Sequence, residues 1–214
     1  MNRPPRGGPR SPVPARAGGS VRIIGGRWRG TRLPVPGIDG LRPTSDRVRE
    51  TLFNWLQPAL PGSRVLDLFA GSGALGLEAV SRGAAAAVLV ERDPQQAAGL
   101  RAAVGRLQAG DQVDVVQEDA LRWLAALAGG DAFDIAFVDP PFAGGLWQPA
   151  LAALLPRLAM DGWLYVESPP DQVPEPPPGW SPHRQLRTAH AHAALYRGPG
   201  RGGADTLATA NPAP

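Results

Sequence analysis

The segment DLFAGSGALG, residues 67–76, carries glycines at positions 71, 73 and 76, which is the G-x-G-x-x-G spacing of dinucleotide-binding loops. The apolar run RVLDLFA (residues 64–70) leads into it, and a helical pattern follows it. A strand, a glycine loop and a helix in this order predict the first unit of a Rossmann-like α/β fold. Glu91 stands 20 residues after Gly71, where the same fingerprint places an acid that binds ribose.

The alternation of strand and helix continues along the chain. Three more apolar segments of strand length are each followed by a helical pattern, and a further apolar segment comes after the last helix. Apolar strands that alternate with amphipathic helices predict a parallel sheet that is buried on both faces. The later strands are expected at residues 85–91, 112–119, 132–141 and 162–168, with a helix at 145–159 and a closing antiparallel pair at 183–198.

The chain divides into four parts by composition. Residues 1–20 and 198–214 offer almost nothing to bury, so we expect two disordered tails, of which the first is basic. Residues 61–197 are expected to form the α/β domain. Residues 21–60 predict a small N-terminal hairpin followed by a helix.

The helix in this N-terminal region is predicted from RPTSDRVRETLFNWL, residues 42–56. Thr44 or Ser45 would be its N-cap. An apolar stripe of Val48, Leu52, Trp55 and Leu56 would face the core, leaving Arg47 and Arg49 off the stripe.

The composition excludes several classes of function. Without cysteine the chain can form no disulfide, thiolate nucleophile or zinc–thiolate site. No apolar run is long enough to cross a bilayer, and the basic N-terminus lacks the apolar stretch of a secretory signal. We therefore expect a cytoplasmic protein with no membrane partner.

Positive charge is concentrated at the N-terminal end of the chain. Residues 1–50 hold 11 Arg and three acidic residues, whereas the remainder holds 11 Arg and 16 acidic residues. This asymmetry predicts an RNA-binding arm on a nearly neutral domain. The alternative is a solvated arginine face that reflects a GC-rich genome, with Trp28 packed on the core instead of stacked on a base. The candidate RNA contacts are Arg22, Arg27, Trp28, Arg29, Arg32, Arg42, Arg47 and Arg49.

Asp67 distinguishes between two nucleoside cofactors that the glycine loop could hold. A nicotinamide dinucleotide would lay its pyrophosphate on the adjacent helix N-terminus, where the carboxylate would repel it. S-adenosylmethionine has no phosphate and carries an ammonium and a sulfonium, which the carboxylate would attract. We therefore expect S-adenosylmethionine and no metal. The candidate cofactor contacts are Asp67, Phe69, Gly71, Gly73, Glu91, Arg92, Asp119 and Ala120; for Asp119, contact with adenine and capping of the next helix remain equal alternatives.

The segment FVDPPF, residues 137–142, predicts a site for a planar amine at the end of the fourth strand. Asp139 and the Pro140 carbonyl can accept hydrogen bonds from an exocyclic NH₂ group, and Phe142 offers a face on which a base can stack. Pro140 and Pro141 stiffen the loop because each fixes φ and removes a backbone donor. The catalytic candidates are therefore Asp139, Pro140, Pro141 and Phe142. The alternative interpretation is that Asp-Pro-Pro is only a rigid turn.

The motifs DLFAGSG, VERD and VDPPF, in this order, resemble the class I S-adenosylmethionine-dependent amino-methyltransferases of DNA, RNA and protein amides. RIIGGRWRG, LRPTSDRVRETLFNWL and DLFAGSGALGLEAVSRGA narrow the resemblance to the RsmD family, over about residues 21–197. It implies a Rossmann-like, mostly parallel seven-stranded sheet with an antiparallel closing strand. It also implies methylation of a guanine N2 amine in 16S rRNA, within the small ribosomal subunit or its assembly intermediate; we expect a monomer.

Other functions remain open from the residues alone. A DNA or other RNA amino-methyltransferase, acting on adenine N6 or cytosine N4, would use the same pocket, although the chain has no room for a target-recognition domain. A protein-glutamine methyltransferase would leave the basic arm without a partner. A nicotinamide oxidoreductase is disfavoured by Asp67, and a non-catalytic RNA-binding module is the remaining alternative. His183, His190 and His192 have no acid or nucleophile near them in the pattern and are expected to be ordinary strand or surface residues.

Overall fold

The structure is a computed structural model and describes residues 19–35, 45–128, 133–142 and 145–200. Most of the two predicted tails, residues 1–18 and 201–214, lies outside these ranges, as does Arg42. Residues 19 and 20, which were assigned to the first tail, instead begin a strand, because they pair with the returning strand of the hairpin.

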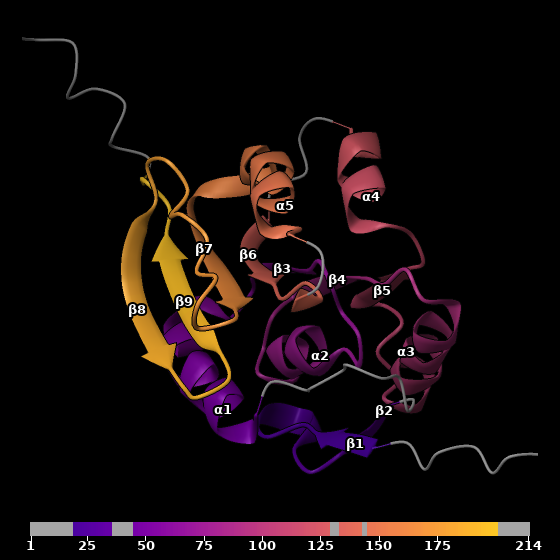
Figure 1. Ribbon diagram of the computed structural model, residues 1–214. Helices are drawn as coiled ribbons and strands as arrows, with labels where there is room; N and C mark the ends of the chain where they lie inside the picture. The colour runs from indigo at the N-terminus through magenta and orange to yellow at the C-terminus, as the bar shows by residue number, and fades with distance from the viewer. Residues whose placement is uncertain (1–18, 36–44, 129–132, 143–144, 201–214) are drawn as a thin grey trace, which may run out of the picture.

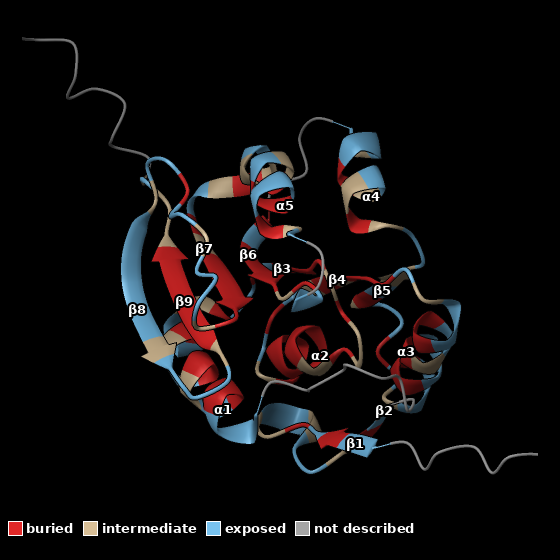
Figure 2. Cartoon of the chain, viewed as in Figure 1, coloured by how far each residue is buried: buried red, intermediate tan, exposed pale blue. Residues whose placement is uncertain are grey.

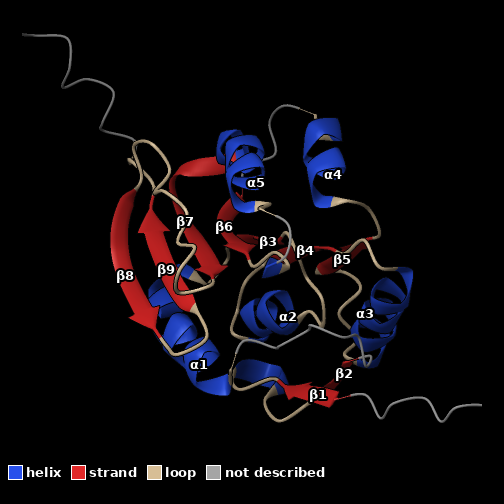
Figure 3. Cartoon of the chain, viewed as in Figure 1, coloured by secondary structure: helices blue, strands red, loops and turns tan. Residues whose placement is uncertain are grey.

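Seven strands form one mixed sheet (Figures 1 and 3). The order across the sheet is β5-β4-β3-β6-β7-β9-β8, and the neighbours from β5 to β7 are parallel. The last strand of the chain, β9, lies between β7 and β8 and is antiparallel to both. This confirms the predicted mostly parallel sheet with its antiparallel closing strand. The strands are β3 (Arg64–Asp67), β4 (Ala86–Val90), β5 (Val113–Val116), β6 (Phe133–Val138), β7 (Leu158–Ser168), β8 (Ser181–Arg187) and β9 (His192–Arg197).

Helices cover both faces of the sheet, so its central strands are buried (Figure 2). Most of the buried apolar side chains of α1 (Asp46–Leu56), α2 (Ala74–Ser81) and α3 (Pro94–Arg106) belong to one apolar cluster. Those of α4 (Ala120–Ala126) and α5 (Trp147–Leu154) belong to a second cluster on the other face. The helix expected to run to residue 159 ends earlier, because a 3-10 turn, η4 (Leu155–Arg157), leads directly into β7.

The N-terminal region forms the predicted hairpin and helix. Strands β1 (Gly19–Arg22) and β2 (Arg32–Val35) are antiparallel, with the 3-10 turn η1 (Gly26–Trp28) between them. Ser45 caps α1 by accepting a hydrogen bond from the Val48 backbone N–H at 3.3 Å. A 3-10 turn, η2 (Gln57–Ala59), follows α1. The hairpin lies alongside the α1–α2–α3 layer, at the bottom of Figure 1.

The position of Arg49 contradicts the prediction that this residue lies on the RNA-binding surface. Arg49 has no exposed surface, because it falls on the same helix face as the buried residues Leu52, Phe53 and Leu56. Its Nη2 donates to Asp46 Oδ1 at 2.6 Å and to the Arg22 carbonyl at 2.8 Å, and its Nη1 lies 3.7 Å from Glu78 Oε2. Arg49 is therefore part of the buried helix face and is removed from the candidate RNA surface.

Candidate cofactor and target-amine site

The three glycines of the loop meet two geometric requirements. Gly71 and Gly73 have φ values of 51° and 74°, in the left-handed region that glycine adopts most easily. A Cβ on Gly73 would also lie 2.5 Å from Leu100 Cδ2. Gly76 lies in α2, and a Cβ there would lie 2.1 Å from Leu89 Cδ2 in β4. The glycines therefore allow both the sharp turn after β3 and the close approach of α2 to the sheet.

Asp67, the last residue of β3, has a buried carboxylate directly behind this loop. Its Oδ2 accepts a 2.9 Å hydrogen bond from the Gly76 backbone N–H. Burial raises the pKa of Asp67 to about 7; the Gly76 hydrogen bond lowers the pKa in part, and the nearby Glu91 carboxylate raises it. A cationic ligand group beside Asp67 would favour its ionised form, so the site suits the charged part of S-adenosylmethionine.

Glu91 follows β4 and fastens the glycine loop to the end of that strand. Its Oε2 accepts a 2.8 Å hydrogen bond from the Gly71 backbone N–H, and its Oε1 accepts one of 2.7 Å from the Asp93 backbone N–H. A carboxylate has about four lone-pair positions, so these two bonds leave acceptor capacity for ribose hydroxyls. The ribose contact itself stays a prediction.

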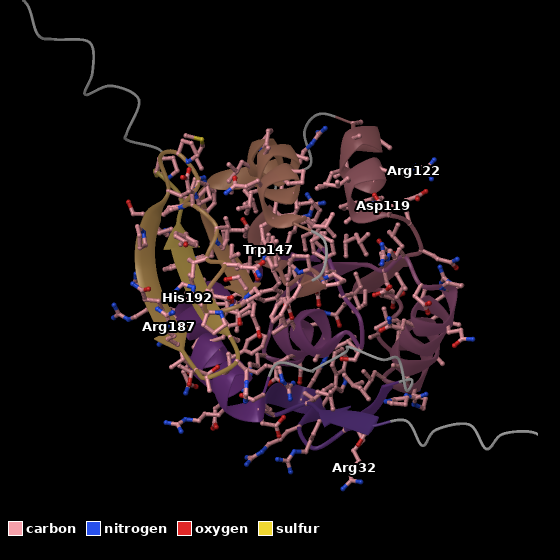
Figure 4. The ribbon with its side chains drawn as sticks, in the orientation of Figure 1. Arg32, Asp119, Arg122, Trp147, Arg187 and His192 are labelled. Carbon is pink, nitrogen blue, oxygen red and sulfur yellow. The ribbon has the colours of Figure 1, made fainter. Side chains whose placement is uncertain are left out.

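Asp119 follows β5 and caps α4, which confirms the capping alternative for this residue. Its Oδ1 accepts hydrogen bonds from the backbone N–H groups of Leu121 at 3.0 Å and Arg122 at 3.2 Å (residues 119 and 122 are labelled in Figure 4). Capping and a contact with adenine are compatible, and the second stays a prediction. Of the other candidate cofactor contacts, Ala120 is buried, Phe69 is half-buried and Arg92 is exposed.

The Asp-Pro-Pro-Phe loop lies at the carboxyl ends of the parallel strands, on the same rim of the sheet as Asp67. β3 and β6 are adjacent parallel strands in which Asp67 pairs with Phe137, so Asp139 follows two residues beyond that level. Pro140 is buried, whereas Pro141 is exposed. The Phe142 side chain is 43% exposed, and its ring centroid lies 6.1 Å from that of Trp147. The structure thus brings the candidate cofactor and target residues together at adjacent strand ends.

The sequence reasoning missed three side chains beside this loop. The Tyr165 hydroxyl donates to Glu167 Oε2 at 2.8 Å, and the Trp147 indole N–H donates to the Glu167 carbonyl at 2.8 Å. Burial raises the pKa of Tyr165 well above its ordinary value, and the carboxylates of Glu167 and Asp139 raise it further. Tyr165 therefore remains a neutral donor. An acid near the carboxyl end of a strand was the available signal, since Glu167 is the last residue but one of β7 and Asp67 is the last residue of β3.

In the N-terminal arm most arginines are exposed to solvent, whereas Trp28 is partly buried. Trp28 is half-buried and packs against the core, and its backbone N–H donates to Ser81 Oγ at 2.9 Å. The Arg27 guanidinium lies 4.2 Å from the centre of the Trp28 ring. The side chain of Arg32 points away from the protein (Figure 4). The exposed arginines of this arm are Arg22, Arg27, Arg29, Arg32 and Arg47, and Arg22 lies 3.5 Å from the Asp46 carboxylate.

Two further features are absent from the described residues. No group of three or more His, Asp or Glu side chains there is arranged to hold a metal ion. No helix within the same ranges combines the length and apolar character needed to cross a membrane.

The sheet order, the glycine loop and the Asp-Pro-Pro-Phe motif after β6 define the class: this is a class I methyltransferase with a Rossmann-like fold. A family model described as conserved hypothetical protein 95 matches residues 21–197. Ribosomal RNA small subunit methyltransferase D of Escherichia coli strain K12 is 46% identical over 190 residues, covering 87% of this chain and 94% of that protein. The chain therefore belongs to the RsmD family, as the resemblance implied.

Other relatives agree with this membership. Ribosomal RNA small subunit methyltransferase D of Haemophilus influenzae is 40% identical over 184 residues, covering 85% of this chain and 95% of the relative. The solved structure of yhhF from Escherichia coli is 47% identical, has a TM-score of 0.75, and covers 84% of this chain and 98% of its own. Membership of this methyltransferase family supports S-adenosylmethionine as the cofactor, rather than a nicotinamide dinucleotide.

Proposed function

We propose that this protein methylates the exocyclic N2 amine of a guanine in 16S rRNA, using S-adenosylmethionine. The substrate would be the small ribosomal subunit or its assembly intermediate, and the enzyme would act as a cytoplasmic monomer. The observation that carries the proposal is the position of Asp139 at the end of β6, beside the strand that ends at Asp67. The names of the relatives support rRNA as the substrate class.

The cofactor residues in this proposal are those around the glycine loop. Asp67 would attract the cationic part of the cofactor, Glu91 would accept hydrogen bonds from the ribose, and Asp119 with Ala120 would border the adenine. Phe69, Gly71, Gly73 and Arg92 complete the proposed set. S-adenosylmethionine supplies an activated methyl group on a sulfonium when it is bound.

Asp139 and its loop would prepare the target amine. The lone pair of the guanine N2 amine is delocalised into the ring, which makes the amine a weak nucleophile. The Asp139 carboxylate and the Pro140 carbonyl would accept hydrogen bonds from the NH₂ group and favour its pyramidal form. Phe142 would stack on the base, since its ring is partly exposed beside Trp147. Positioning by fixed acceptors is the main catalytic contribution that we assign to these residues.

Tyr165 and Glu167 would support the target loop from the neighbouring strand. Their carboxylate–hydroxyl hydrogen bond is buried, and Val138 pairs with Val166 at the ends of β6 and β7. Asp139 is close enough to influence the pKa of Tyr165. This buried support would limit movement of Asp139, because packed polar networks rigidify the residues around them.

The exposed arginines of the arm would bind RNA phosphates. Their affinity for RNA should fall steeply with salt, since each neutralised phosphate releases counterions. Arg22, Arg27, Arg29, Arg32 and Arg47 remain in this proposal, together with Arg42 from the undescribed segment. Trp28 remains as a candidate contact only through the part of it that stays exposed, because it is half-buried and packs on the core.

The test uses labelled S-adenosylmethionine with undermethylated small subunits, naked 16S rRNA and DNA. Wild-type protein should place the label in N2-methylguanosine of the rRNA. Asp139→Asn should reduce transfer by about 10²-fold or more, since a charged acceptor at the reacting amine is lost. Asp161→Asn, on an exposed part of β7 far from this loop, is the matched control and should retain activity. Label found only in DNA, or in N6-methyladenine or N4-methylcytosine, would contradict the proposal.

A further inference from the structure

The C-terminal hairpin of β8 and β9 carries charge of one sign only. Between residues 176 and 200 the sequence contains three Arg and three His but no Asp or Glu. This region is separate from the N-terminal arm in the sequence, since strands β3 to β7 lie between them. A stretch with no acid offers nothing that would neutralise its arginines locally.

The arginines of this hairpin lack carboxylate partners throughout the described part of the chain. Arg184 Nη1 donates to the His183 carbonyl at 3.1 Å, and Arg187 Nη2 donates to the Pro170 carbonyl at 2.7 Å. Arg197 instead lies over the Trp163 ring, 4.4 Å from its centre. Arg184 and Arg187 are exposed, so their charge is available to a ligand.

The strand that carries Arg184 and Arg187 is the edge of the sheet. β8 pairs only with β9 within the described ranges, and every residue of β8 except Leu186 is exposed. Figure 2 shows β8 mostly in the exposed colour beside the buried β9. An exposed edge strand without an apolar face is unsuited to packing against the core of another domain, but its side chains can reach a polar ligand.

The end of this hairpin where β8 turns into β9 lies at the carboxyl ends of β6 and β7, on the same rim of the sheet as the target loop. Arg187 pairs with His192, and His192 pairs with Ser168 at the end of β7 (Arg187 and His192 are labelled in Figure 4). Val166, two residues before Ser168, pairs with Val138 at the end of β6, directly before Asp139. Arg187 is thus displaced from Asp139 mainly across three strand spacings, which is about 14 Å. That separation places it beside the site and not within it.

The charge of this edge at neutral pH comes from arginine. Burial lowers the pKa of His183 and of His192, and the neighbouring arginines lower both further: Arg184 and Arg197 for His183, and Arg187 for His192. These two imidazoles are therefore neutral at pH 7. A planar guanidinium fork matches the oxygens of a phosphate, which makes arginine the preferred residue for phosphate contacts.

We propose that the β8 edge strand, from whose two faces Arg184 and Arg187 project, forms a second RNA-binding surface, which holds backbone phosphates of the strand flanking the target guanine. The inference rests on the proposed function, because it takes RNA as the substrate. The RNA would thus be held at two separate regions, the N-terminal arm and the β8 edge. The target loop lies beside the β8 edge. The β8 edge would orient the RNA strand and would not take part in methyl transfer.

The experiment compares two double variants that remove equal charge. Arg184→Gln with Arg187→Gln tests the β8 edge, and Arg101→Gln with Arg106→Gln on the exposed side of α3 is the matched control. Binding of a labelled 16S rRNA fragment is measured by fluorescence anisotropy over a range of salt concentrations, in parallel with steady-state methyl transfer. Thermal unfolding with and without S-adenosylmethionine verifies that both variants fold and bind cofactor.

The β8 variant should raise the Kd and the KM for RNA by about 5- to 10-fold at moderate salt, and should leave kcat at saturating RNA unchanged. The slope of log K against log salt should fall in magnitude by about 1.4, which is about 0.7 for each single-strand phosphate contact. Equal Kd and slope in the β8 and control variants would overturn the proposal. A loss seen only with assembled subunits, and absent with naked RNA, would overturn it in favour of an acidic protein partner.

The same experiment distinguishes failure of the proposed function from failure of the β8 proposal. Because binding is measured separately from methyl transfer, a wild-type protein that transfers no methyl to rRNA would contradict that function. The predicted change in slope in the β8 variant would still support the phosphate contact.

Discussion

Glu78 in α2 accepts a 2.7 Å hydrogen bond from the backbone N–H of Gly25 in the N-terminal hairpin, 53 residues earlier in the sequence. The same buried carboxylate accepts 2.7 Å hydrogen bonds from the Ile24 backbone N–H and from Arg82 Nε, and its Oε2 lies 3.7 Å from Arg49 Nη1. One carboxylate thus joins the hairpin, α1 and the helix that begins at the glycine loop. The proposed RNA-binding arm is therefore docked on the cofactor domain.

Replacing Glu78 by Gln should loosen this docking. The amide would present a donor toward backbone N–H groups and would remove the buried charge that faces Arg49. We expect the free energy of unfolding to fall by about 3–5 kcal/mol, which is typical for breaking a buried ion pair. Urea unfolding would measure this change. Glu50→Gln, on the exposed side of α1, should change it by less than about 0.5 kcal/mol; a similar loss in both variants would contradict the docking role.

The raised pKa of Asp67 predicts a pH dependence of stability. Its pKa rises from the ordinary 3.8 to about 7 on folding, so the folded chain binds this proton more tightly than the unfolded chain. The stability contributed by this proton is present at low pH and is lost as the pH rises from about 4 to 7. Urea unfolding across this range should show Asp67→Asn gaining stability relative to the wild type as the pH increases.

The same residue predicts a pH dependence of cofactor binding. Ionised Asp67 attracts a cationic ligand, so S-adenosylmethionine should bind wild-type protein more tightly at pH 8 than at pH 6. Asp67→Asn should bind it more weakly at pH 8, with little dependence on pH. Titration calorimetry at both pH values would test this, and unchanged affinity in the variant would remove Asp67 from the cofactor site.

Gly76 is predicted to tolerate no side chain. A Cβ there would lie 2.1 Å from Leu89 Cδ2 and 3.2 Å from Asp67 Cβ, so α2 would have to move away from β4. We expect Gly76→Ala to cost about 1–3 kcal/mol of unfolding free energy through overpacking, and to weaken cofactor binding. Gly105→Ala in α3 meets no atom within 4 Å and should be stabilising by about 0.5–1 kcal/mol, as measured by the same denaturation.

Phe142 is predicted to act on the RNA substrate through its ring face. Phe142→Leu should raise the KM for rRNA by about 5- to 150-fold, which corresponds to a stacking contribution of about 1–3 kcal/mol. Phe142→Tyr keeps the ring and should remain near the wild-type value. Steady-state kinetics with RNA as the varied substrate would show the difference; equal KM values for the leucine and tyrosine variants would indicate that no base stacks there.

The alternation of strands and helices made most of the fold predictable. Apolar periodicity located the strands and helices, and the glycine spacing placed the cofactor loop after β3. Asp139 was located because the parallel arrangement puts the ends of neighbouring strands at one rim. These inferences need only local pattern and the rules of βα connectivity.

Long-range pairing of charged groups was not predictable in the same way. Arg49 lies three, four and seven residues before Leu52, Phe53 and Leu56 in a buried helical pattern, but its charge led to a surface assignment. Its partner Glu78 is on another helix, and only the folded arrangement brings the two together.

The position of β9 inside the sheet has a consequence for biosynthesis. β7 and β8 are both made before β9, yet among the described residues their strand pairing runs only through β9. Until residue 197 has been synthesised, β7 presents an unpaired edge with apolar side chains, and β8 has no strand to join. The nascent chain is therefore exposed to mispairing late in translation, and a truncation before residue 192 should yield an aggregating product instead of a smaller folded enzyme.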